Sequence, residues 1–108
     1  FALESTVGRP KAAVGRERVL DINPECQVEA LEVFVDAATL DAVLTPPPDL
    51  VLDAIDALGP KLELLAGAYA RGLRVLSSMG AALRTDPSQI RVADLMARCE
   101  CPLALRLR

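Results

Sequence analysis

Small and apolar residues recur at steps of three and four between Pro10 and Ile22, and this spacing predicts a helix. The residues on its predicted face are Ala12, Gly15, Val19 and Ile22. Asn23 precedes a proline and is therefore disfavoured in helical conformation, so we expect the helix to end there. From Cys26 to Val35 the pattern changes to alternation with period two, which predicts a strand.

Two more helices and two more strands are predicted after Val35. Asp36 is a good N-cap for a short helix with a buried stripe of Leu40, Val43 and Leu44, and the prolines that follow Thr45 end it. Leu50 to Ile55 is almost continuously apolar, which is typical of a parallel strand covered on both faces. The next helix has Pro60 in its first turn, ends at Gly72 and leads into a strand from Leu73 to Met79. Its predicted buried face is Leu58, Leu62, Leu65, Ala66 and Tyr69.

Asp86-Pro87 predicts a turn, Ile90 to Asp94 a further strand, and the chain ends in what reads as a new helix. Alternating strands and short-looped helices define an α/β fold, specifically a partial Rossmann-like, mostly parallel sheet with flanking helices. Ligands of such sheets bind beyond the carboxyl ends of the strands. The polar or small residues expected there are Asp53, Asp56, Ser77, Ser78 and Gly80.

Composition limits the function classes. The 108 residues suffice for one domain, and 52% hydrophobic but only 3% aromatic residues predict an aliphatic core. A net charge of −3 gives no bulk attraction to nucleic acid or to an anionic membrane, so RNA contacts would have to be local. The apolar runs are far shorter than the ~20 residues of a membrane span, and we expect a cytoplasmic protein.

The three cysteines do not define a metal or disulfide framework. Cys26, Cys99 and Cys101 are few and unevenly spaced, and no histidine is present to complete a zinc site. Cys99-Glu-Cys101 alone is a weak metal signal, and a buried thiol at Cys26 is the structural alternative.

Two carboxylates follow the most apolar strand. Asp56 lies where this strand gives way to a loop, so its oxygens could hold Mg²⁺ against the phosphates of a nucleotide, while Asp53 would lie deeper. In the structural alternative, Asp56 caps the next helix and Asp53 accepts hydrogen bonds from backbone amides.

Cations near the first helix are the phosphate candidates. Lys11 begins that helix, where an ammonium and the amide dipoles together favour a phosphate, and Arg9 is the best placed arginine to join it. From the residues alone, both are more commonly solvated surface side chains. Neither G-x-G-x-x-G nor G-x-x-x-x-G-K-[ST] is present.

Together these segments resemble the tRNA threonylcarbamoyladenosine dehydratases, a branch of the ThiF/MoeB/HesA ubiquitin-activating-enzyme-like superfamily. The segment from Phe1 to Lys11 is similar to the one that follows the superfamily's Asn-x-x-Arg-Gln motif, and Asp53-Ala-Ile-Asp56 matches its Asp-x-x-Asp. Ser78-Met-Gly80 and Asp86-Pro-Ser-Gln-Ile-Arg-Val-Ala-Asp94 are similar to the dehydratase branch in particular. Ala81-Ala82-Leu83 is less glycine-rich than the family usually is after Met-Gly, which weakens the expectation of close substrate contact there.

The resemblance implies ATP- and Mg²⁺-dependent adenylation of the carboxylate of threonylcarbamoyladenosine in tRNA, followed by ring closure that expels AMP. Lys11 would contact the ATP phosphates with Arg9 nearby, and Asp56 would bind Mg²⁺ with Asp53 in support. The chain would be an internal part of one ThiF-type adenylating domain, with the Gly-rich loop upstream of Phe1 and a further region downstream, and would be inactive and poorly soluble alone. A homodimer and a sulfurtransferase-system partner are further implications.

Two other functions remain open from the sequence. One is an adenylyltransferase that activates the C-terminus of a ubiquitin-like sulfur-carrier protein, whose relatives usually carry paired Cys-x-x-Cys zinc motifs. The other is a non-catalytic relative kept as a dimerisation or binding module.

Overall fold

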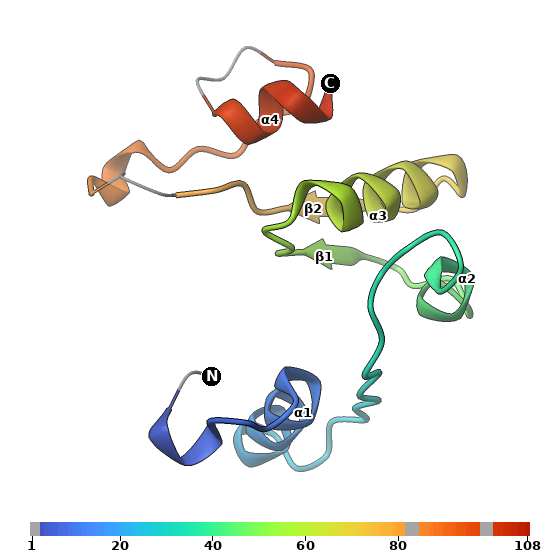
Figure 1. Cartoon of the computed structure of the whole chain (residues 1–108), viewed down its shortest axis with the longest axis vertical. Coiled ribbons are helices and arrows are strands. Elements are labelled where there is room, and N and C mark those ends of the chain that lie inside the picture. Colours follow the sequence, from blue (N-terminus) through green and yellow to red (C-terminus); the bar gives the residue numbers. More distant parts are fainter. Residues whose placement is uncertain (1–2, 82–84, 98–100) are drawn as a thin grey trace. The chain divides into compact units, whose positions relative to one another are not determined.

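The computed structural model describes residues 3–81, 85–97 and 101–108. The chain divides into two compact units, Phe1–Phe34 and Val35–Arg108 (Figure 1). Cys99 and the run Ala82-Leu83, which were considered above, lie outside the described residues.

The first unit is built on helix α1, Lys11–Ile22, preceded by a short 3-10 turn, Glu4–Thr6. The helix begins directly after Pro10 and ends at Asn23, whose extended backbone leads into Pro24, so its prediction is confirmed. The predicted buried face is wrong in part, because Val14 is the buried residue of the helix while Val19 and Ile22 are exposed.

Residues 26–35 form no strand among the described residues, which contradicts the prediction. Burial does alternate with period two from Cys26 to Ala30, as the sequence pattern requires. A strand also needs a neighbouring strand to accept and donate its backbone hydrogen bonds. Instead, the Val28 carbonyl accepts a hydrogen bond from Arg16 Nε at 3.3 Å. The alternating sequence pattern therefore predicted which side chains are more buried, but not whether the segment pairs with another strand.

The second unit opens with a capped turn and helix α2, Leu40–Val43. The Asp36 carboxylate accepts hydrogen bonds from the backbone N–H groups of Ala38 and Thr39, both at 2.9 Å. The prediction of Asp36 as the N-cap of this helix is wrong, because Thr39 is the N-cap of α2 and no side chain caps it; Asp36 instead caps the turn that precedes α2. Leu40 and Leu44 are buried, as their spacing predicted.

Strands β1, Val51–Asp53, and β2, Val75–Ser77, pair in parallel and are connected by helix α3, Leu58–Ala70 (Figure 1). Asp53 and Ser77 are register partners at the carboxyl ends of the two strands. Gly72, with φ 66°, ends α3, because its N–H and that of Leu73 turn back to the carbonyls of Tyr69 and Ala68. The α/β fold with a parallel sheet and flanking helices is therefore confirmed.

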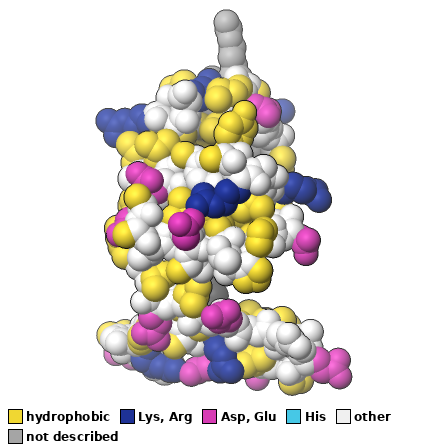
Figure 2. Space-filling view, turned by 90° about the vertical axis from the view of Figure 1, so that its right-hand side faces the viewer, with side chains coloured by type: hydrophobic (Ala, Val, Ile, Leu, Met, Phe, Trp, Pro, Cys, Tyr) yellow, Lys and Arg dark blue, Asp and Glu magenta, His cyan; other side chains and the backbone are white. Residues whose placement is uncertain are grey.

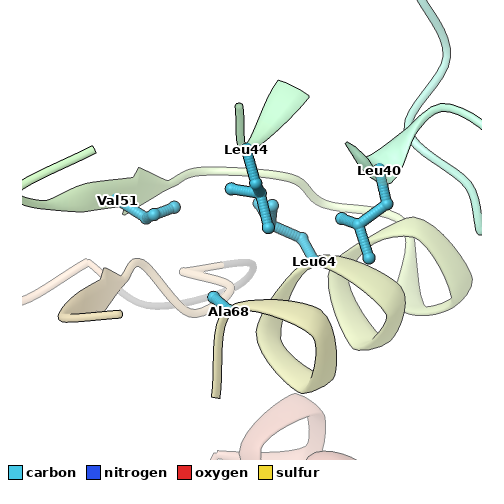
Figure 3. Close-up of a cluster of buried hydrophobic side chains, with 5 residues drawn as sticks. All are labelled: Leu40, Leu44, Val51, Leu64 and Ala68. Atoms are coloured by element: carbon cyan, nitrogen blue, oxygen red, sulfur yellow. The ribbon is translucent and has the colours of Figure 1, made fainter. Parts of the chain in front are cut away.

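The core of this unit lies between α2, α3 and β1. Figure 3 shows its five buried side chains, which are Leu40, Leu44, Val51, Leu64 and Ala68. The buried residues of α3 are Lys61, Leu64, Gly67 and Ala68, so the predicted face with Leu62 and Tyr69 is wrong. Helix α3 is apolar almost all round, and its periodicity therefore does not distinguish one face from another.

One face of the strand pair is open within the described residues. Leu52 and Leu76 are register partners with 70% and 52% of their surface exposed, whereas Val51 and Asp53 face the core. The expectation of a strand covered on both faces is thus not met within this chain. Figure 2 shows hydrophobic side chains at the surface among scattered charges of both signs.

The last segment contains a 3-10 turn, Pro87–Gln89, and helix α4, Pro102–Leu107. The Asp86 carboxylate accepts a hydrogen bond from Ser88 N–H at 3.0 Å, so the predicted turn is confirmed. Residues 90–94 form no strand in the part of the chain that the structure describes, and Ile90 and Val92 are exposed. No described helix combines the length and apolar character needed to cross a membrane.

Candidate functional site

A buried polar cluster joins the carboxyl ends of β1 and β2. The Lys61 ammonium is fully buried and donates to Asp53 Oδ2 at 2.5 Å, to Ser77 Oγ at 3.1 Å and to the Ser78 carbonyl at 2.9 Å. These three acceptors match the three N–H donors of an ammonium group. The Ser77 hydroxyl also donates to Asp53 Oδ2 at 2.5 Å. Four residues from three elements are therefore held in one network.

The Asp53 carboxylate stays ionised in this cluster. Burial raises the pKa of Asp53, but hydrogen bonds from Lys61, Ser77 and the Ile55 N–H, together with the Lys61 charge, outweigh burial and lower the pKa below its ordinary 3.8. The bond from Ile55 N–H to Asp53 Oδ1 is 2.9 Å long. The alternative in which Asp53 accepts from backbone amides is thus realised, together with an ion pair.

Asp56 lies in the loop between β1 and α3, and its side chain is exposed. Its carboxylate makes no hydrogen bond or ion pair within residues 3–81, 85–97 and 101–108. The alternative in which Asp56 caps the next helix is wrong, because Ala57 is the N-cap of α3 and no side chain caps it. A solvent-facing carboxylate at the carboxyl edge of parallel strands has the position and the hard oxygen donors that Mg²⁺ prefers.

Arg9 and Lys11 belong to the first unit. Lys11 is the first residue of α1 and is exposed, while Arg9 pairs with Glu17 one to two turns into the helix. A hydrogen bond from Arg9 and its charge lower the pKa of Glu17 despite some desolvation. Both cations line a hollow of about 340 Å³, together with Leu3, Glu4, Thr6, Val7, Gly8 and Val14. This hollow is therefore lined by two cationic side chains and one carboxylate beside apolar side chains.

The predicted site residues thus fall in two pairs. In the second unit, Asp53 ends β1 and Asp56 lies in the loop that follows it. In the first unit, Arg9 and Lys11 line one hollow. Sequence reasoning missed Lys61, although its spacing from Leu64 and Ala68 would have placed it on the buried face of α3. A buried acid at Asp53 also required a cationic partner.

Among the described residues, no group of three or more His, Cys, Asp or Glu side chains lies close enough together to bind a metal ion. The thiols of Cys26 and Cys101 are free and partly buried. Any metal at Asp56 would therefore take most of its ligands from elsewhere, as Mg²⁺ does when it binds through one or two carboxylates and substrate phosphates.

Comparison with known proteins identifies the class. The model of the ThiF family matches residues 1–105, so the chain belongs to the ThiF family. It is 39% identical over 107 residues to the tRNA threonylcarbamoyladenosine dehydratase of Bacillus subtilis, an alignment that covers 99% of this chain and 42% of that protein.

A solved structure agrees with this match. The crystal structure of the E. coli tRNA N6-threonylcarbamoyladenosine dehydratase in complex with ATP has a TM-score of 0.93 and 37% sequence identity, over 99% of this chain and 44% of that one. A molybdopterin-synthase adenylyltransferase from E. coli is 35% identical over 83 residues, which is 77% of this chain and 32% of that protein. The chain spans less than half the length of these relatives.

Proposed function

We propose that the full-length protein containing this chain is an ATP-dependent tRNA threonylcarbamoyladenosine dehydratase. The supporting observation is the match over 99% of the chain to a dehydratase whose structure was solved with ATP, at a TM-score of 0.93. The dehydratase relative from Bacillus subtilis aligns over the same share of the chain.

ATP and Mg²⁺ are proposed from the family resemblance, and the solved relative in complex with ATP supports the choice of nucleotide. Asp56 would hold Mg²⁺, because its carboxylate is exposed beside the strand ends and is not engaged by another described residue. Lys11 would contact the phosphates, and Arg9 would join it by exchanging Glu17 for a phosphate. When bound, Mg²⁺ neutralises phosphate charge that builds up as pyrophosphate leaves.

The proposed reaction converts a poor electrophile into a good one. A carboxylate oxygen of the substrate bonds to the α-phosphorus of ATP and pyrophosphate leaves. An internal nitrogen of the substrate then bonds to the carboxyl carbon, loses its proton and expels AMP, which closes a hydantoin-type ring. The net change in the nucleoside is loss of one water. Cationic side chains such as Lys11 assist by stabilising charge on the leaving phosphates.

Asp53 is assigned a supporting role. Its side chain is buried and both of its oxygens accept hydrogen bonds from Lys61, Ser77 and Ile55. Such a carboxylate supports the neighbouring loop more readily than it contacts a nucleotide.

The partners follow from the same proposal. The substrate is tRNA that carries threonylcarbamoyladenosine, in keeping with the names of the relatives. A homodimer, a sulfurtransferase-system partner and a cytoplasmic location remain predictions from the family resemblance.

The second candidate function is activation of a ubiquitin-like sulfur-carrier protein. It is favoured by the 35% identity to a molybdopterin-synthase adenylyltransferase, which covers a smaller share of this chain than the dehydratase match.

AMP release separates the two candidates. We would incubate the full-length protein with ATP, Mg²⁺ and one of three additions: threonylcarbamoylated tRNA, unmodified tRNA, or a carrier protein ending in Gly-Gly. The dehydratase proposal predicts AMP only with the modified tRNA, and loss of this AMP in Asp56→Asn but not in the matched surface variant Glu63→Gln. AMP or pyrophosphate released only with the carrier would overturn the proposal.

A further inference from the structure

The proposed reaction does not explain why Lys61 is buried. It lies in the first turn of α3, none of its surface is exposed, and it faces β1 and β2 rather than solvent. A lysine is almost never fully buried without a partner, because removal of an ammonium from water is costly. All three of its donors are used within the network of Asp53, Ser77 and Ser78.

Stability alone is a weak reason for this arrangement. Replacing a buried ion pair by apolar residues of similar volume is often neutral or stabilising, since desolvation offsets the Coulomb gain. An ion pair differs from apolar packing in its directionality, because each hydrogen bond fixes the distance and angle between two defined groups.

The groups joined by this network enclose the loop that carries Asp56. Asp53 ends β1 and Lys61 lies eight residues later in α3, so their contact closes the segment between them. Asp53 also accepts from the N–H of Ile55, the residue directly before Asp56. On the other side, Ser78 N–H donates to the Asp53 carbonyl at 2.7 Å, which ties the end of β2 to the same point.

We infer that Lys61 is a positioning residue, which holds the Asp56 loop and the end of β2 at the carboxyl edge of the sheet by bonding Asp53, Ser77 and the Ser78 carbonyl at once. Lys61 acts on the substrate only through these residues. The consequence for magnesium binding rests on the proposed function, whereas the consequence for the loop does not.

The test uses two variants of the full-length protein. Lys61→Met removes the donors at nearly constant length. Asp53→Asn/Lys61→Met also removes the partner charge, so that no unpaired charge is left buried. Arg74→Met, which removes an exposed cation at the start of β2, is the control.

The first readout is amide hydrogen exchange of residues 54–57, with the middle of α3 as internal reference. We expect exchange in the loop to become at least tenfold faster in the double variant, with unchanged exchange in α3 and an unchanged urea midpoint. Unchanged exchange in the loop would overturn the inference, whether or not the protein proves to be a dehydratase.

The second readout is the Mg²⁺ concentration that gives half-maximal ATP binding, measured by calorimetry, and half-maximal AMP release. We expect both to rise about tenfold in the double variant and to stay unchanged in Arg74→Met. Faster loop exchange with an unchanged Mg²⁺ requirement would also refute the positioning role. A wild-type protein that releases no AMP with modified tRNA would refute the proposed function alone, and loop exchange would still decide the inference.

Discussion

Replacement of Gly67 by alanine tests the packing of α2 against α3. Gly67 lies in the buried face of α3, directly opposite Leu40 of α2. A Cβ atom at this position would overlap Leu40 Cδ2 and would lie 3.1 Å from Leu40 Cγ and 3.2 Å from Arg71 Nη1. Carbon atoms in favourable contact are about 3.5–4.0 Å apart. Either the Leu40 side chain or helix α2 must therefore move.

The cost can be worked from the surroundings of Leu40. Its side chain is buried in the same cluster as Leu44 and Leu64 (Figure 3), so a shift of Leu40 disturbs packed neighbours. Overpacking of this kind costs about 1–3 kcal/mol. Alanine gains about 1 kcal/mol over glycine in a helix interior. We expect a net loss of about 0–2 kcal/mol, which is the difference between these two contributions.

Urea unfolding of the full-length protein, followed by circular dichroism, measures this change against a matched variant. Gly59 lies in the first turn of the same helix with nothing within 4 Å of an added Cβ, so Gly59→Ala gains helix propensity without a clash. We expect Gly67→Ala to be less stable than Gly59→Ala by about 1–3 kcal/mol, the overpacking cost. In a Leu40→Ala background, Gly67→Ala should become stabilising. Equal stability of the two glycine variants, or an unchanged cost without Leu40, would refute this packing.

Three further predictions concern the buried ion pair and the end of α3. Lys61→Met should lower the free energy of unfolding by about 3–5 kcal/mol, because it leaves the Asp53 charge buried and unpaired. A urea titration that shows a loss of less than about 1 kcal/mol would contradict this. Since the pKa of Asp53 is lowered by folding, its contribution is present above its ordinary pKa of 3.8 and is lost as pH falls through the lower folded value. Measured from pH 5 downward, the free energy of unfolding should therefore fall more steeply for the wild type than for Asp53→Asn. Parallel pH dependences of the two proteins would rule out the effect. Gly72→Ala should cost about 1–2 kcal/mol in a thermal melt, because φ at Gly72 is 66°, and no change would mean that this backbone conformation is not required.

Much of the second unit could be predicted from local sequence. The continuous apolar run before Asp53 predicted β1, and the glycine at position 72 predicted the end of α3. The buried positions Leu40 and Leu44 of the short helix were also predicted from their spacing. Each of these features depends on residues a few positions apart, so the local sequence is sufficient to predict it.

Features that depend on distant residues could not be predicted in this way. Residues 26–35 and 90–94 alternate as strands do. Among the described residues, however, neither segment pairs with a neighbouring strand. Lys61 looked like an ordinary helix lysine, because its burial depends on Asp53 and on Ser77, which is sixteen residues away. The roles of Asp56, Lys11 and Arg9 came from a resemblance, since side-chain exposure alone does not identify a ligand.

The central claim is most directly tested by mass spectrometry of nucleosides from threonylcarbamoylated tRNA after incubation with the full-length protein, ATP and Mg²⁺. We predict that the modified adenosine loses one water with the wild type and with Glu63→Gln, but not with Lys11→Ala or Asp56→Ala. No mass change with the wild type, under conditions in which a carrier protein stimulates release of pyrophosphate from ATP, would contradict the account.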